Sequence, residues 1–119
     1  MTIKELKNKK DYLFKCYVSK RTLAKPIKEG ECVDEWGCAF LSLGDREMVE
    51  YNFCIDNTTG ELINSSAIYK VCYYKELEEC FSEVDTSNYI HYEIDFSNRK
   101  WKKELETAMC EAAIKLFNL

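Results

Sequence analysis

The residues of this sequence whose types and spacing could do chemistry begin with its one histidine. His91 stands two and four residues before Glu93 and Asp95. A neighbouring carboxylate raises the pKa of an imidazole, which can tune it as a general base. Residues at this spacing diverge along a strand, however, and no second histidine or nucleophile accompanies them. A small hydrolase using His91, Glu93 and Asp95 is therefore kept only as an alternative.

Acidic residues form the second group, because the charge of the chain is unevenly distributed. Residues 32–98 hold fourteen Asp or Glu against three Lys or Arg, whereas residues 1–31 and 99–119 are net positive. A folded acidic surface attracts a basic partner, and carboxylates spaced along a strand can imitate nucleic-acid phosphates. The residues expected to contact such a partner are Glu76, Glu78, Glu79, Glu83, Asp85, Glu93, Asp95, Tyr74 and Tyr89. Acidic runs also serve as solvated faces that aid solubility, so both interpretations stay open.

A third group is basic and lies where the last predicted helix begins. Arg99, Lys100 and Lys103 are cations at a helix N-terminus, where they oppose the helix dipole. This placement suggests that they hold an anion. Together with tyrosines that can stack on a base, they support a second alternative, a homodimer that sequesters a small anionic nucleotide. An incidental charge cluster would explain the same residues.

Several classes of function are disfavoured by what the sequence lacks. The seven cysteines include no CxxC pair, and there is no second histidine, so we expect no metal, no disulfide framework and no cofactor. Most thiols should act as small core side chains. No phosphate-binding glycine loop or nucleophile elbow is present, which favours a non-enzymatic protein without catalytic residues. No signal peptide or apolar run of about 18 residues is found, which predicts a cytoplasmic protein that does not enter membranes.

The elements that must position these residues are indicated by their hydrophobic periods. Alternation with a period of two predicts five strands, at residues 12–20, 36–43, 47–56, 61–75 and 89–96. Thr2 and Glu5 fit a capping box for a helix over 3–9. An apolar stripe with helical spacing predicts a second helix over 98–117, capped by Ser97 or Asn98. Residues 76–87 are expected to form a short helical turn or loop.

The order of these elements predicts one α+β domain over residues 1–119, with an antiparallel sheet of about five strands, a short N-terminal helix and a long C-terminal helix on one face. The charge pattern favours a small protein that inhibits or neutralises a basic, nucleic-acid-handling protein, such as a nuclease or a CRISPR-type effector. A phage anti-CRISPR inhibitor and a nuclease-toxin immunity protein are two settings for that activity. Direct binding of nucleic acid is not expected, since the acidic body repels phosphates, and a homodimer is compatible with the sequence.

Overall fold

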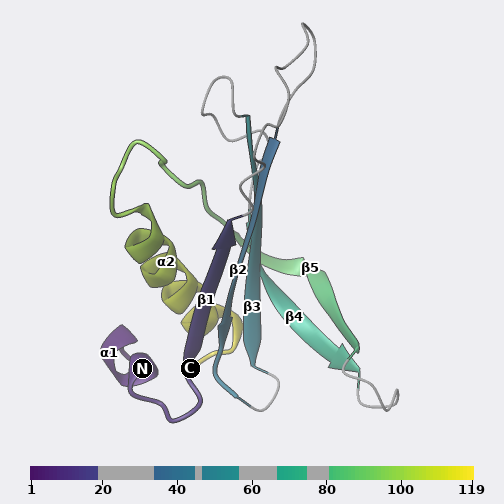
Figure 1. The fold of residues 1–119 in the computed structure, drawn as a ribbon. Coiled ribbons are helices and arrows are strands. Elements are labelled where there is room, and N and C mark those ends of the chain that lie inside the picture. The colour runs from purple at the N-terminus through teal and green to yellow at the C-terminus, as the bar shows by residue number, and fades with distance from the viewer. Residues whose placement is uncertain (19–33, 45–46, 57–66, 75–80) are drawn as a thin grey trace, which may run out of the picture.

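The computed structural model describes residues 1–18, 34–44, 47–56, 67–74 and 81–119, and for 34–36, 55–56, 72–74 and 81–86 only the backbone. These residues contain one sheet whose five strands follow one another in chain order, each antiparallel to the next. The strands are β1 (Leu13–Val18), β2 (Asp34–Ser42), β3 (Met48–Asp56), β4 (Ala67–Tyr74) and β5 (Phe81–His91). Helices α1 (Ile3–Lys7) and α2 (Trp101–Leu116) lie on the same side of the sheet (Figure 1). The predicted α+β architecture is confirmed.

Helix α1 begins as the sequence predicts, at a capping box. The Thr2 hydroxyl accepts a hydrogen bond from the backbone N–H of Glu5 at 3.1 Å, and the Glu5 carboxylate accepts one from the backbone N–H of Thr2 at 3.3 Å. The helix ends at Lys7, two residues earlier than predicted, with Asn8 as its C-cap. Leu6 points inward and is fully buried, so a helix of five residues is anchored by one core side chain.

The sheet has an inner face, which α2 covers, and an outer face. Along β1, half-buried Phe14, Cys16 and Val18 alternate with exposed Leu13, Lys15 and Tyr17, as a period of two requires. The buried core combines the inner face with both helices, and it comprises Leu6, Ala39, Leu41, Leu43, Val49, Tyr51, Phe53, Ile68, Ile94, Leu105, Met109, Cys110, Ala112 and Ala113. Gly37 belongs to the inner face, and the ring of Phe53 occupies the space that a side chain at Gly37 would fill.

The last strand differs from the prediction. Strand β5 covers Phe81–His91, so residues 81–87 are extended rather than forming a helical turn or loop, and residues 81–85 are paired with β4. The prediction was wrong because it followed the acidic composition of this segment, which disfavours a strand. Backbone hydrogen bonds to β4, which is rich in β-forming residues, stabilise the strand instead. Between Tyr69 and Lys70 the register with β5 shifts, because Tyr69 pairs with Tyr89 but Lys70 pairs with Asp85. The pairing of β4 and β5 is therefore interrupted by a bulge.

Residues 92–96 lie outside the sheet, although their alternation predicted a strand over 89–96. The carbonyl of Tyr92 accepts a hydrogen bond from the Tyr51 hydroxyl at 3.0 Å, and no strand pairs with these residues in the described part of the chain. Ile94 is nonetheless buried, and the Phe96 ring lies 5.7 Å from that of Phe53. The alternation therefore reflected burial against the core, not hydrogen bonding in a ladder.

Helix α2 begins three residues later than predicted, and neither proposed cap is used. Lys100 is the N-cap and makes no side-chain capping bond. Asn98 instead accepts a hydrogen bond from the backbone N–H of Lys100 at 2.9 Å and donates one to Glu104 at 2.7 Å. The predicted apolar stripe is confirmed, since Leu105, Met109 and others on it are buried against the inner face. No helix in the described part of the chain is long and apolar enough to cross a lipid bilayer.

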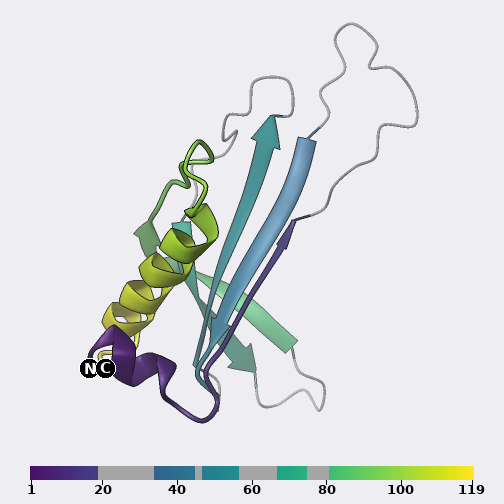
Figure 2. The same cartoon turned by 60° about the vertical axis from the view of Figure 1, so that its left-hand side comes forward.

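The two ends of the chain lie side by side, with α1 against the C-terminal part of α2 (Figures 1 and 2). The aromatic ring of Phe117, just beyond α2, is also held to the sheet, since the Lys70 ammonium lies 5.0 Å from its centroid. Such a cation–π contact contributes roughly 0.5–1 kcal/mol when it is exposed to solvent. The helix layer is thus fixed to the sheet at several points along its length.

Candidate functional site

One row of side chains crosses the outer face of the sheet from edge to edge. Each strand contributes one residue, and neighbours in the row are paired Cα partners: Lys15, Phe40, Glu50, Tyr69 and Tyr89, here called the outer row. Directly opposed residues of antiparallel strands have their Cβ atoms roughly 4.5–5.5 Å apart on the same face. Neither helix in the described part of the chain covers this face (Figure 1).

Aromatic side chains make up most of the outer row. The rings of Tyr69 and Tyr89 have centroids 5.7 Å apart, and Phe40 lies at the same distance from Tyr17, which belongs to the neighbouring row. Tyr89 and Tyr17 are 56% and 51% exposed, so large apolar surfaces with polar tips face outward. Tyrosine with this exposure is typical of protein interfaces, where one end of the ring is buried and the other stays hydrated.

A carboxylate lies between the two aromatic pairs. Glu50 is opposite Phe40 on one side and Tyr69 on the other, and its Oε1 accepts a hydrogen bond from Asn52 at 3.3 Å. The pKa of the nearby Cys38 thiol is raised, mainly by burial and further by the charge of Glu50. The thiol is therefore held in its protonated form, and Glu50 is the negative charge that this part of the outer face presents.

The structure places the predicted partner-binding residues in three groups. Tyr89 belongs to the outer row, and Glu93 and Asp95 are exposed just beyond the end of β5. Because these two carboxylates do not lie in a strand, the regular spacing assumed for phosphate mimicry does not apply to them. Glu83 and Asp85 lie in β5, where only the backbone is described, as it is for Tyr74 in β4. Glu76, Glu78 and Glu79 lie outside the described residues.

Four outer-row residues were not among the site residues expected from the sequence: Lys15, Phe40, Glu50 and Tyr69. The alternation of each strand indicated which residues share a face. It could not show which residue of one strand lies beside which residue of the next, because that depends on the register. The only available signal was the two-residue period combined with an assumed turn length, and residues 57–66 between β3 and β4 allowed several registers.

His91 lies at the end of β5, and only one of the two predicted acidic neighbours is close to it. Its Nε2 is 3.5 Å from the Glu93 Oε1, and both side chains are more than half exposed. Asp95 instead accepts hydrogen bonds from the backbone and the hydroxyl of Ser97. An exposed pair of this kind contributes roughly 0–1 kcal/mol to stability. The three side chains thus form a pair and a separate turn, and the catalytic alternative gains no support from this geometry.

The turn at Asp95 allows a test by titration. Hydrogen bonds from the Ser97 side chain and backbone lower the pKa of Asp95 below its usual value. The contribution of this turn to stability is therefore present above the usual pKa of aspartate and is lost as the pH falls through the lowered one. We expect the Asp95 carboxyl carbon to titrate below its usual range by NMR, and Ser97→Ala to move the midpoint upward. An unchanged midpoint in the variant would mean that the hydroxyl does not hold the carboxylate.

The predicted anion-binding residues lie at the start of α2. Arg99, Lys100 and Lys103 are exposed, and within the described part of the chain none of them forms an ion pair. The backbone carbonyl of Lys103 accepts a hydrogen bond from Thr107 at 3.1 Å, as a helical position allows. Nucleotide sequestration by these residues remains a prediction of the sequence.

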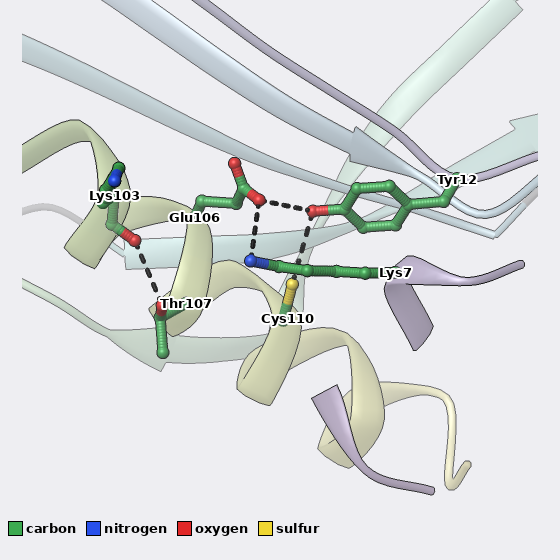
Figure 3. Close-up of polar contacts among 6 residues, drawn as sticks. All are labelled: Lys7, Tyr12, Lys103, Glu106, Thr107 and Cys110. Atoms are coloured by element: carbon green, nitrogen blue, oxygen red, sulfur yellow. Dashed lines mark hydrogen bonds and ion pairs between the residues drawn. The ribbon is translucent and has the colours of Figure 1, made fainter. Parts of the chain in front are cut away.

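A polar cluster joins α1 to α2 at Tyr12, the residue that precedes β1 (Figure 3). The Tyr12 hydroxyl donates a hydrogen bond to Glu106 Oε1 at 3.1 Å and lies 3.6 Å from the Cys110 Sγ. The Lys7 ammonium lies 3.0 Å from the same carboxylate oxygen. Burial raises the pKa of the Tyr12 hydroxyl and of the Cys110 thiol, so both stay protonated. Because nucleophilic cysteines need a lowered pKa, we interpret this cluster as structural.

The cysteines in the described residues behave mainly as apolar side chains. Cys54 and Cys110 are buried, and Cys16 and Cys38 are half-buried. Burial also raises the pKa of the Cys16 thiol. No group of three His, Cys, Asp or Glu side chains that could hold a metal ion is found where the structure describes the chain.

Comparisons with known proteins add no identification. No protein-family model, no curated protein and no solved structure matches this chain.

Proposed function

We propose that this protein is a non-enzymatic inhibitor that binds a basic, nucleic-acid-handling protein through the outer face of its sheet. The observation that carries the proposal is the outer row, in which Glu50 lies between Phe40 and the pair of Tyr69 and Tyr89. A protein that binds nucleic acid presents clustered Lys and Arg, and covering that cluster blocks its function. A phage anti-CRISPR-type inhibitor and an immunity protein against a nuclease toxin are the settings in which such binding is needed.

The chemistry of the row favours arginine as the group that it recognises. A guanidinium can form two parallel hydrogen bonds with a carboxylate and can stack on an aromatic ring. Lysine offers a point charge without the planar fork. Glu50 with Tyr69 beside it supplies both a carboxylate and a ring in one place. Exposed Glu93 and Asp95 follow Tyr89 in the chain, just beyond the end of β5, and add two carboxylates there.

The proposal is tested with fluorescent nona-arginine and nona-lysine peptides as probes of a basic surface. We expect the arginine peptide to bind more tightly, with affinity that falls steeply between low salt and several hundred millimolar salt. The protein should also displace the arginine peptide from a labelled DNA duplex. Glu50→Gln should weaken arginine-peptide binding about tenfold, which corresponds to the loss of one hydrogen-bonded charge pair.

A matched control separates the outer row from net charge. Glu111→Gln removes the same charge from an exposed position on α2, on the other side of the sheet. We expect this variant to bind the arginine peptide nearly as well as the wild type. Equal losses in the two variants, or equal affinity for the two peptides, would contradict recognition of arginine by the outer row.

A further inference from the structure

Strand β1 forms one edge of the sheet, and its outward side is unoccupied in the described part of the chain. Among the described strands it pairs only with β2 and stands at the end of the strand order. Among the described residues, the backbone groups of Leu13–Val18 have no hydrogen-bond partner on that side. An edge of this kind exposes unpaired N–H and C=O groups that can add another strand. Leu13 and Tyr17, which flank the exposed Lys15, are about half exposed.

The sequence of β1 is complementary to itself in one register. Consider two antiparallel copies related by a twofold axis perpendicular to the sheet. Directly opposed residues then lie on the same face, which requires that one residue of β1 lies opposite the same residue of the second copy, at the axis. Five residues of β1 are paired with the second copy only when the axis lies at Lys15 or at Cys16. The first register places Lys15 directly against the second copy's Lys15, which is unfavourable.

The register centred on Cys16 has complementary pairs on both faces. On the outer face, each Lys15 lies opposite the second copy's Tyr17, where an ammonium can contact an aromatic ring. On the inner face, each Phe14 lies opposite the second copy's Val18, an aromatic and β-branched pair that stabilises sheets. Lys15 therefore favours one register and opposes the other.

From this self-complementarity we infer that two copies of the chain join through β1, antiparallel and centred on Cys16, into one continuous sheet. The inference is independent of the proposed function. Its consequence for that function is that the two outer rows lie on the same face of a single sheet, so that the dimer presents the binding surface twice. Two linked surfaces bind a repeated basic surface more tightly than one does, without any new kind of contact.

The association is tested by light scattering coupled to size exclusion at micromolar concentration. The wild type should have twice the mass of one chain. Tyr17→Lys places a lysine opposite Lys15 and should give monomers, whereas Tyr89→Lys, an equally exposed tyrosine on the opposite edge strand, should remain dimeric. The double variant Lys15→Glu with Tyr17→Lys restores opposite charges and should recover the dimer. Circular dichroism checks that each variant is folded.

A cross-link tests the register itself. Directly opposed residues have Cα atoms about 4.5 or 5.5 Å apart, within the roughly 4.4–6.8 Å that a disulfide spans. Diamide, which accepts the two electrons and two protons released by two thiols, should therefore link the chains through Cys16, and Cys16→Ser should abolish the link. A monomeric wild type, a double variant that stays monomeric, or cross-linking that survives Cys16→Ser would overturn the inference.

Discussion

Replacing Gly37 with alanine should strongly destabilise this protein. The Cβ of the alanine would overlap the outer atoms of the Phe53 ring, which is buried at 2% exposure. The overlap is removed only if the Phe53 ring moves away from Phe96 and Trp101 or if β2 and β3 separate. We expect a loss of about 3 kcal/mol or more in the free energy of unfolding, measured with urea.

A second substitution shows whether the ring is the cause. The atoms nearest to the added Cβ are the Cζ and Cε atoms of Phe53, which leucine lacks. The double variant Gly37→Ala with Phe53→Leu should therefore be only slightly less stable than Phe53→Leu alone. The losses in the free energy of unfolding from the two substitutions would then be strongly non-additive. Additive losses would assign the effect of Gly37→Ala to the backbone instead of the ring.

Truncating Leu105 to alanine should remove much of the stability that α2 gains from the sheet. Leu105 is fully buried between the helix and the inner face, and Leu→Ala substitutions at such sites cost about 2–5 kcal/mol, depending on the cavity left behind. A domain of this size is stabilised by about 5–15 kcal/mol, so the loss would be a large fraction of the total. The midpoint of urea unfolding should fall accordingly.

The control for Leu105 lies on the exposed side of the same helix. Glu111→Ala removes a solvent-exposed side chain at an interior helical position, and such changes usually alter stability by less than about 0.5 kcal/mol. Comparable losses in the two variants would indicate that helix formation, and not packing on the sheet, limits the stability. A changed denaturant slope in Leu105→Ala would indicate partial detachment of α2 in the native state.

Much of the fold could be predicted from local signals. The capping box at Thr2 and Glu5 was correctly identified because both partners lie three residues apart. The alternation over β1 and β2 correctly assigned residues to faces, since burial follows the two-residue period. Residues 81–85 were mispredicted because pairing with β4 overrides their composition. The caps expected for α2 were wrong because Ser97 and Asn98 are used in the preceding turns.

The candidate site was less predictable, because it depends on relations between distant residues. Tyr89 was expected to contact a partner, but its neighbours in the outer row follow from the registers of four strand pairs. The contact between Tyr12 and Glu106 joins residues 94 positions apart and has no local signature. The acidic segment around Glu78, which first suggested a basic partner, lies outside the described residues. Its role remains a prediction.

The shortness of α1 has a consequence for how the two ends of the chain move. A five-residue peptide does not hold a helical conformation in water, because nucleation is unfavourable and too few hydrogen bonds follow it. The Leu6 amide, bonded to the Thr2 carbonyl at 3.0 Å, is therefore protected only while Leu6 is packed in the core and Lys7 stays near Glu106. We expect Leu6 and the neighbouring turns of α2 to exchange their amide hydrogens at similar rates. Both ends would then open and close as one cooperative unit.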